Sequence, residues 1–527
     1  MSSLGFNTGY IEELYKQYLD DPDSVSESWR EFFADYHPDA SFVPTTQTTG
    51  DGEPTAAPAD QSTEPAPDAK PEAREAPSEP TGDGAAPAIR AASAPSVDED
   101  EVEVQALRGP AAKIVENMED SLGIPTATSA RTMPVKLLDE NRSLLNDYQK
   151  QVGGEKVSYT HIIAYALVQG LKKYPDMNTT FRRDEEGTPQ HVKPDQINLG
   201  LAIDIERRGK RTLLVPNVKD AGSLTFAEFL GIYNDIISRA RNNDLDLSDF
   251  QGTTATLTNP GMIGTSMSVA RLMPGQGVIV GAGAIGYPPE YRGYDPAVAS
   301  KAGVSPVMTL TSTYDHRVIQ GATSGAFLNY MEELLMGDHD FYHELFGDLG
   351  VPYQPYSMAT DSTPQLGQSA PQDELDMTEK QAAVLQLIRA YRVRGHLQAD
   401  TNPLGYEWQY HEELDPASYG LTIWDLDREF ITGGLGGEEK LPLREILSIL
   451  RKAYTSKVGT AFMHISDPDE KDWIQNRIEP MRNAEPPSEE ERHRIVQKLN
   501  AAEAFERFLH TKYIGHKRFS LEGAETM

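Results

Sequence analysis

The chain has 527 residues, no cysteine and a formal net charge of −33. This length predicts two or three domains, and the lack of cysteine excludes disulfides, thiolate metal ligands and cysteine nucleophiles. The acidic balance argues against nucleic-acid binding, and the absence of a long apolar stretch or a secretion signal predicts a cytoplasmic protein with no membrane span.

The N-terminal segment 7–37 has the pattern of two short amphipathic helices on either side of an Asp-Pro-Asp turn. Its apolar positions are Tyr10, Leu14 and Tyr18 in the first helix and Trp29, Phe32 and Phe33 in the second. A segment this short cannot form a core of its own, so we expect it to pack on another surface. That surface is either the rest of its own chain or a partner subunit, and the sequence leaves both open. We assign residues 1–40 to this arm.

Residues 41–105 are rich in Ala, Pro, Glu, Asp and Ser and contain almost no large apolar side chain. Such a composition cannot bury enough apolar surface to offset the entropy of ordering, which predicts a disordered linker. The proline content predicts that this linker is extended rather than collapsed.

Residues 106–350 mix strand and helix patterns, which predicts an α+β domain with a mixed sheet and helices on one face. Helices are expected over 158–175, stopped by Pro175, and over 224–241, where Thr225 and Glu228 form a capping box. The expected strands are 197–205, 212–218, 253–259, 277–285 and 307–314.

Two of these strands end in side chains suited to acyl transfer. The strand over 307–314 leads to His316 and then Gly321, and the strand over 253–259 contains Thr258 next to Asn259 and a Pro-Gly turn. Transfer to a thiol needs a base for the thiol proton and a donor for the oxyanion, which predicts these roles for His316 and Thr258. The structural alternatives are a histidine that only packs and a threonine that bonds to its neighbours.

Gly281, Gly283 and Gly286 form a G-x-G-x-x-G pattern directly after an apolar strand. A dinucleotide site also requires a helix to begin there, because the helix N-terminus binds the pyrophosphate. The next segment, 287–298, is rich in Pro, Gly and Tyr and cannot form that helix. We therefore exclude nucleotide binding at this position.

After a second linker over 351–375, residues 376–527 are predicted to be helical. Three long amphipathic stretches cover 377–400, 441–458 and 488–515.

Residues 108–340 resemble the dihydrolipoamide acyltransferases of 2-oxo-acid dehydrogenase complexes, which have a chloramphenicol acetyltransferase-like fold. The motif D-H-R-x-x-D-G of that family reads Asp315 to Gly321 here, with Gln320 in place of the second acid. The resemblance implies catalytic roles for His316, Thr258 and Gln320, with Asp315 shaping the turn and Arg317 pairing locally. It also implies coenzyme A as a substrate and trimers with the active site between subunits. The substitution at Gln320 leaves open a catalytically inactive scaffold.

Segment 7–37 and the helical region resemble the N-terminal part of the thiamine-dependent 2-oxoglutarate dehydrogenases. The combination resembles the fused 2-oxoglutarate dehydrogenase–succinyltransferases of actinobacteria. This implies succinyl transfer, a lipoyl group supplied by a lipoyl-bearing acyltransferase partner, and dihydrolipoamide dehydrogenase as a further partner.

Thiamine diphosphate and Mg²⁺ are expected only in the full-length enzyme. The chain is expected to stop short of that cofactor region and not to decarboxylate 2-oxoglutarate alone. Arg518 would border the cofactor site, or it would belong to a solvated basic patch. The two Gly-Asp-Gly sequences at 50–52 and 82–84 lie in the linker and are attributed to chance.

Overall fold

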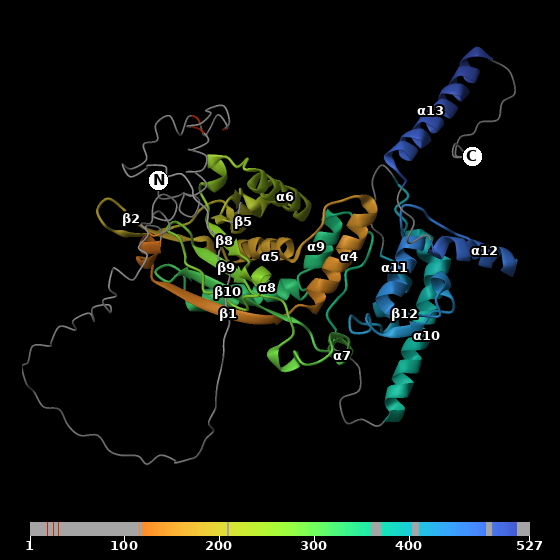
Figure 1. Cartoon of the computed structure of the whole chain (residues 1–527), viewed down its shortest axis with the longest axis horizontal. Coiled ribbons are helices and arrows are strands. Elements are labelled where there is room, and N and C mark those ends of the chain that lie inside the picture. The colour runs from red at the N-terminus through yellow and green to blue at the C-terminus, as the bar shows by residue number, and fades with distance from the viewer. Residues whose placement is uncertain are drawn as a thin grey trace, which may run out of the picture.

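The computed structural model describes residues 118–207, 210–359, 370–402, 410–480 and 487–513, together with the single residues 18, 25, 30 and 115 (Figure 1). The linker predicted over 41–105 and Arg518 lie outside the described residues, as does most of the N-terminal arm.

A six-stranded mixed sheet forms the centre of the first region, as predicted (Figure 1). Its strand order is β1 (Thr126–Pro134), β10 (Val307–Asp315), β9 (Val278–Ala282), β8 (Ala255–Thr258), β4 (Leu199–Leu201) and β7 (Asn217–Val218). β10 runs antiparallel to both β1 and β9, whereas β8 runs parallel to both β9 and β4. The α+β prediction is therefore confirmed.

Three strand predictions need correction. The expected strand 197–205 divides into β4 in the main sheet and β5 (Ile203–Arg207), which pairs with β6 (Lys210–Leu214) in a separate hairpin. The expected strand 212–218 breaks before β7 at Pro216, which has no N–H for the ladder. β1 was not predicted, because its sequence TATSARTMP lacks apolar alternation. A further hairpin joins β2 (Thr180–Arg183) and β3 (Pro189–Val192).

The side chains of β10 alternate between two environments. Leu310 and Tyr314 are buried in the core, and the Ser312 hydroxyl accepts a hydrogen bond of 3.0 Å from Ser324 of α8 (Gly321–Leu335). On the opposite face, Thr311 donates to the Ser268 carbonyl at 2.8 Å. The hydroxyls of Thr309 and Thr313 pair across the sheet with those of Thr132 and Thr128, both at 2.8 Å. β10 therefore separates a helix-covered core from a hydroxyl-lined face.

The helices that build the core begin and end as their sequences predict. α5 (Tyr159–Lys173) begins after Ser158 and ends just before Pro175. α6 (Phe226–Asn242) has the predicted capping box, in which the Thr225 N–H donates to Glu228 at 2.9 Å. The other helices of this region are α4 (Lys136–Val152), α7 (Pro296–Lys301), α8 and α9 (Phe341–Asp348).

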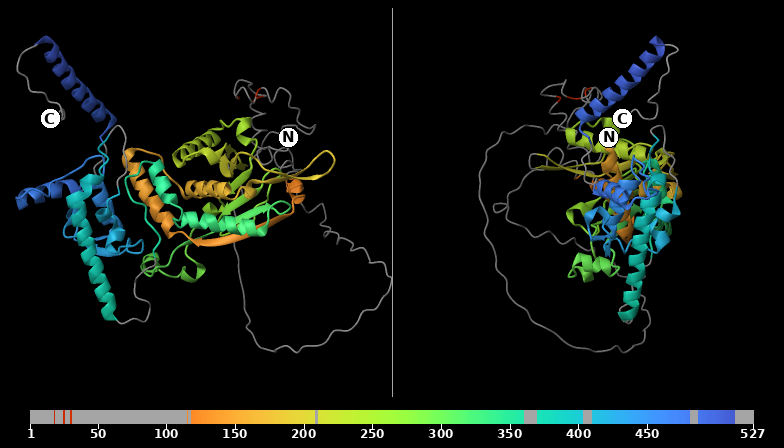
Figure 2. Two further views of the ribbon diagram at one scale, coloured as in Figure 1. Left: turned by 180° about the vertical axis from the view of Figure 1, so that it is seen from behind. Right: turned by 90° about the vertical axis from the view of Figure 1, so that its right-hand side faces the viewer.

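The C-terminal region is mostly helical, as predicted. It contains α10 (Ala370–Arg394), α11 (Leu443–Tyr454), α12 (Pro468–Ile478), α13 (Glu489–Lys512) and a hairpin of β11 (Glu429–Ile431) and β12 (Lys440–Pro442). α10 and α11 lie side by side, and α13 projects away from them (Figures 1 and 2). Short 3-10 turns occupy Pro175–Asn178, Ala221–Ser223, Leu247–Phe250, Pro260–Ile263, Pro289–Tyr291, Gly395–Gln398, Glu412–Leu414, Pro416–Tyr419 and Leu435–Gly437.

A charge network joins α4 to the helical region. Arg444 of α11 donates to both oxygens of Glu140 at 2.8 and 2.9 Å and to Asp427 at 2.6 and 2.9 Å. Lys136 contacts the same two carboxylates, both at 3.1 Å. Burial opposes ionisation of Asp427, but the Ser300 hydroxyl and the two cations lower the pKa of this carboxyl to about 2. Each carboxylate thus has two cationic partners, which offsets the cost of burying charge.

Two described residues of the N-terminal arm lie against the hydrophobic core. Val25 is 6% exposed and belongs to the core, and Tyr18 is partly buried against it. These contacts favour packing of the arm on its own chain.

His161 is a buried titratable group at the start of α5. Its Nδ1 accepts from the Ser158 N–H at 3.2 Å, and its ring packs edge-on against Tyr233 with centroids 4.4 Å apart. Burial lowers the pKa of His161 to about 4, well below the usual value near 6.5.

We predict that His161 makes the protein sensitive to mild acid. Because its pKa is lower in the folded state, the stabilisation is complete above about pH 6.5 and is lost at about 1.4 kcal/mol per pH unit as the pH falls towards 4. His161→Gln keeps a side-chain acceptor for the capping box but does not titrate. Urea unfolding at pH 6.5 and pH 5 measures the effect. Wild type should lose about 2 kcal/mol more than the variant, and equal losses would contradict this assignment.

Candidate active site

His316 lies in the turn that follows β10, and local hydrogen bonds fix its position. Its N–H donates to the Pro125 carbonyl at 2.9 Å, and its ring Nδ1 lies 2.9 Å from the Ile319 carbonyl. A carbonyl can only accept, so Nδ1 carries the hydrogen and Nε2 keeps its lone pair. The ring packs edge-on against Tyr314, with centroids 5.6 Å apart, and the side chain is exposed. This is the tautomer and exposure that a general base needs.

Asp315 and Arg317 fix the turn around the histidine. Asp315 is 2% exposed and accepts from the Arg317 N–H at 3.0 Å and from its guanidinium at 2.7 and 2.9 Å. The guanidinium also lies 4.0 Å from the centre of the Phe181 ring. Arg317 therefore pairs locally and Asp315 shapes the turn. Phe181 lies in a hairpin more than a hundred residues earlier in the chain, and nothing in the sequence indicates that it contacts Arg317.

Gln320 is the N-cap residue of α8, but its side chain makes no capping hydrogen bond. Its carbonyl accepts from the Ser324 N–H at 3.1 Å. The imidazole is held by the Ile319 carbonyl instead, a contact that sequence analysis missed because any residue could supply it. An acid at position 320 is therefore not required to orient His316.

Thr258 is the last residue of β8 and is half-buried. Within the described part of the chain its hydroxyl makes no hydrogen bond, whereas the Thr256 hydroxyl donates to Gln276 at 2.8 Å. Asn259 donates to the Thr160 hydroxyl at 2.9 Å and so holds the turn after β8. The Thr258 hydroxyl is thus available to donate to a bound group.

One chain does not bring Thr258 and His316 together. Thr258 lies opposite Gly281 of β9, which in turn lies opposite Thr311 of β10. Because β10 runs antiparallel to β8 and β9, His316 lies five positions beyond Thr311 towards the other end of the sheet. At about 3.3 Å per residue this is roughly 16 Å along the strand. The two side chains can meet only if they come from different copies of the chain.

The glycines of β9 allow a loop to pack closely on the sheet. A Cβ at Gly281 would lie 2.6 Å from the Thr311 hydroxyl, and one at Gly283 would overlap the Ser266 carbonyl. The segment after β9 leads to a bridge and a 3-10 turn rather than a long helix. Close packing therefore accounts for Gly281 and Gly283, whereas a Cβ at Gly286 would meet no atom within 4 Å.

Large apolar side chains are exposed on the loop that follows Thr258. Four of them are more than half exposed: Met262, Ile263, Met267 and Val269. We call them the loop patch. Adjacent exposed apolar side chains are typical of contact surfaces.

Within the described residues, no cluster of three or more His, Asp or Glu side chains could hold a metal ion. In the same ranges, no helix has the length and apolar character needed to cross a membrane.

Comparison with known families and proteins identifies relatives of the whole chain. Residues 99–340 match the family of 2-oxoacid dehydrogenase acyltransferase catalytic domains, and residues 4–40 match the 2-oxoglutarate dehydrogenase N-terminus. The multifunctional 2-oxoglutarate metabolism enzyme of Mycolicibacterium vanbaalenii is 44% identical over an alignment of 564 positions. The 2-oxoglutarate dehydrogenase E1/E2 component of Corynebacterium glutamicum is 46% identical over an alignment of 542 positions.

Both alignments cover 100% of this chain but only 42% of the relative, so the chain spans less than half the length of these proteins. Among solved structures, the truncated catalytic core of the 2-oxoacid dehydrogenase multienzyme complex from Thermoplasma acidophilum is 26% identical, with a TM-score of 0.37. That match covers 44% of this chain and 98% of the other. The resemblance to the acyltransferase family is confirmed by the family match.

We predict that Gln320→Asp stabilises the protein. An Asp at an N-cap accepts hydrogen bonds from the first turn of the helix, which Gln320 does not do, and a good N-cap contributes about 0.5–2 kcal/mol. The free energy of unfolding, measured with urea at pH 7.5, should rise by about 0.5–1 kcal/mol. Gln320→Ala is the control and should give no gain. An equal gain in both variants would show that the cap is not the cause.

Proposed function

The chain belongs to the actinobacterial multifunctional 2-oxoglutarate dehydrogenases and forms their N-terminal, acyltransferase-bearing part, and on this basis we propose that it transfers a succinyl group from dihydrolipoamide to coenzyme A. The observation that carries the proposal is the exposed imidazole of His316, whose Nδ1 is occupied by the Ile319 carbonyl and whose Nε2 is free to accept a proton.

The reaction needs two roles from the protein. His316 Nε2 accepts the thiol proton of coenzyme A, and the resulting thiolate attacks the thioester carbonyl to form a new carbon–sulfur bond. The Thr258 hydroxyl donates to the oxyanion of the tetrahedral intermediate. Collapse breaks the bond to the dihydrolipoamide sulfur, which takes the proton back from His316. The acyl group never bonds to the enzyme, which suits a chain without cysteine.

The active site would form between two copies, with Thr258 from one and His316 from the other. The separation of the two residues along the sheet supports this arrangement, because no local shift of a strand brings them together. The loop patch beside Thr258 supports self-association at this end of the sheet. A closed ring is the simplest assembly with such head-to-tail contacts, and we propose a trimer.

The remaining parts of the reaction would come from other proteins and from the rest of the enzyme. The lipoyl group would come from a lipoyl-bearing acyltransferase, and dihydrolipoamide dehydrogenase would reoxidise it. Thiamine diphosphate, Mg²⁺ and the decarboxylation of 2-oxoglutarate would belong to the part of the relatives that this chain does not cover, with Arg518 near that site. We place the enzyme in the cytoplasm and expect no nucleic-acid or membrane partner.

We predict that loss of either residue impairs transfer and that mixing the two variants restores it. His316→Ala should lower succinyl-coenzyme A formation by roughly 10²–10⁴-fold, and Thr258→Ala by about 10²–10³-fold. If a site uses one residue from each of two copies, random assembly of the two variants leaves about a quarter of the sites intact.

The measurement is succinyl-coenzyme A formation from succinyl-dihydrolipoamide by each variant and by both co-expressed with different tags and purified through both. Recovery well above either variant alone is expected. A double-tagged sample no more active than the single variants would contradict a shared site. Near wild-type rates in both single variants would contradict the catalytic assignments.

Gln320 favours one alternative, a domain that has lost catalysis and only assembles the complex. The structure holds His316 without help from position 320, so we predict an active wild type whose rate changes by no more than about tenfold to a hundredfold in Gln320→Asp. Succinyl transfer by both proteins, each with a saturating lipoyl domain, tests this. An inactive wild type together with an active Gln320→Asp would establish the scaffold instead.

A further inference from the structure

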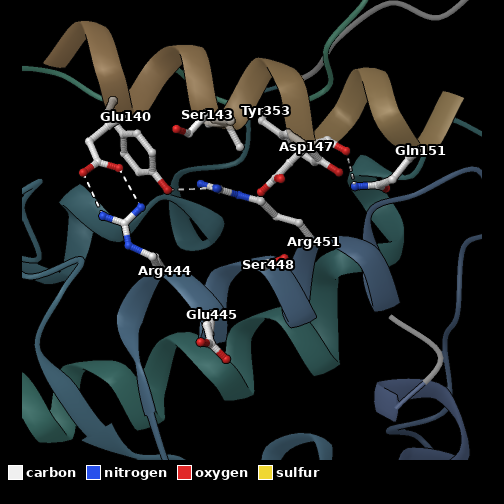
Figure 3. A pocket seen from close by; sticks show the side chains of 11 residues that line it. Glu140, Ser143, Asp147, Gln151, Tyr353, Arg444, Glu445, Ser448 and Arg451 are labelled. Atoms are coloured by element: carbon white, nitrogen blue, oxygen red, sulfur yellow. Dashed lines mark hydrogen bonds and ion pairs between the residues drawn. The ribbon is translucent and has the colours of Figure 1, made fainter. Parts of the chain in front are cut away.

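A second site lies away from His316, between α4 and α11. A cavity of about 170 Å³ opens there, and residues from the segment before α10 complete its wall (Figure 3). Figure 3 shows Arg444 and Arg451 reaching from α11 towards α4, which carries Glu140, Ser143, Asp147 and Gln151.

Arg451 is the notable group in this cavity because it is a buried cation without a counter-charge. The residue is 7% exposed, and its guanidinium donates to the Tyr356 hydroxyl at 2.9 Å. The rings of Tyr353 and Tyr356 each lie 5.3 Å from it. Tyr391 also interacts with the guanidinium, so its neighbours are three tyrosines, and among the described residues it makes no ion pair with any carboxylate. A buried charge without a partner costs several kcal/mol, so folded proteins normally pair it.

A second polar group in the same wall also lacks a partner. The Tyr353 hydroxyl is buried, in a residue that is 5% exposed, and within the described ranges it has no hydrogen-bond partner of good geometry, although the Thr455 side chain lies nearby. The guanidinium donates N–H hydrogen bonds and the phenol donates an O–H hydrogen bond. Both groups need an acceptor that the cavity wall does not supply. Their shared requirement is an anionic oxygen.

The other cations of this region are not available to a ligand. Arg444 donates to Glu140 and Asp427, and Lys136 contacts the same two carboxylates. The lining also contains Asp147 and the exposed Glu445. With one unpaired cation and two further acids, the cavity favours an anion with a single charge over a dianion.

We propose that this cavity binds a small monocarboxylate, with its carboxylate on Arg451 and within reach of the Tyr353 hydroxyl. A carboxylate matches the planar fork of a guanidinium and can accept two parallel hydrogen bonds from it. The inference is independent of the proposed acyl transfer, because none of the lining residues takes part in that reaction.

Acetate and pyruvate are the probes, and 2-oxoglutarate and inorganic phosphate are the comparison anions. Binding to the full chain is measured by calorimetry and by the thermal midpoint at constant ionic strength with sodium chloride. Saturable binding of the monocarboxylates is expected, with a rise in the midpoint of about 2 °C or more. Arg451→Gln should weaken binding by at least about tenfold, as expected for loss of a charged hydrogen bond.

Ser448→Glu covers the case in which Arg451→Gln does not fold. Ser448 also lines the cavity, one helical turn before Arg451, so a glutamate there supplies the missing counter-charge from within the chain. This variant should raise the midpoint of the unliganded protein and abolish the response to acetate. Lys452→Gln is the matched control, because it removes a cation from the same helix outside the cavity lining, and it should respond like wild type.

Three results would overturn the proposal. The first is no saturable binding of either monocarboxylate to wild type. The second is an undiminished response in Ser448→Glu. The third is tighter binding of phosphate or 2-oxoglutarate than of acetate and pyruvate, which would refute the choice of a monocarboxylate.

Discussion

The direction of β10 is the constraint on which the arrangement of this protein depends. β10 lies between β1 and β9 and runs antiparallel to both, while β8 and β9 run parallel to each other. His316 follows β10 and Thr258 ends β8, so they lie at opposite ends of one sheet. The proposed site, which needs both side chains, would therefore take one from each of two copies of the chain.

The turn that holds His316 is fixed mainly by adjacent residues, with two further contacts from the distant Pro125 carbonyl and Phe181 ring. The Ile319 carbonyl fixes the ring, and the Asp315–Arg317 pair fixes the backbone around it. Position 320 contributes its backbone to the start of α8 and no side-chain contact to the cap. This independence explains physically how a family motif can lose an acid at Gln320 and keep the histidine in place.

Charge pairing distinguishes the two sides of the junction between α4 and α11. At one end, two cations and two carboxylates satisfy one another, as Lys136 and Arg444 do with Glu140 and Asp427. At the other end, Arg451 is surrounded by tyrosines and has no carboxylate partner in the part of the chain that the structure describes. An unpaired buried cation is unusual in a chain with a net charge of −33. The proposed monocarboxylate would bind in the adjacent cavity and neutralise it.

The sequence by itself determined the elements whose signals are local. These are the capped starts of α5 and α6, the end of α5 before Pro175 and the strand that leads to His316, because caps, proline and alternation act within a few residues. Only the tertiary structure decided the pairing of β1 with β10, the opposite positions of Thr258 and His316, and the isolation of Arg451. Each of these depends on which distant segments lie side by side, and strand direction and buried charge pairing leave no periodic trace in the sequence.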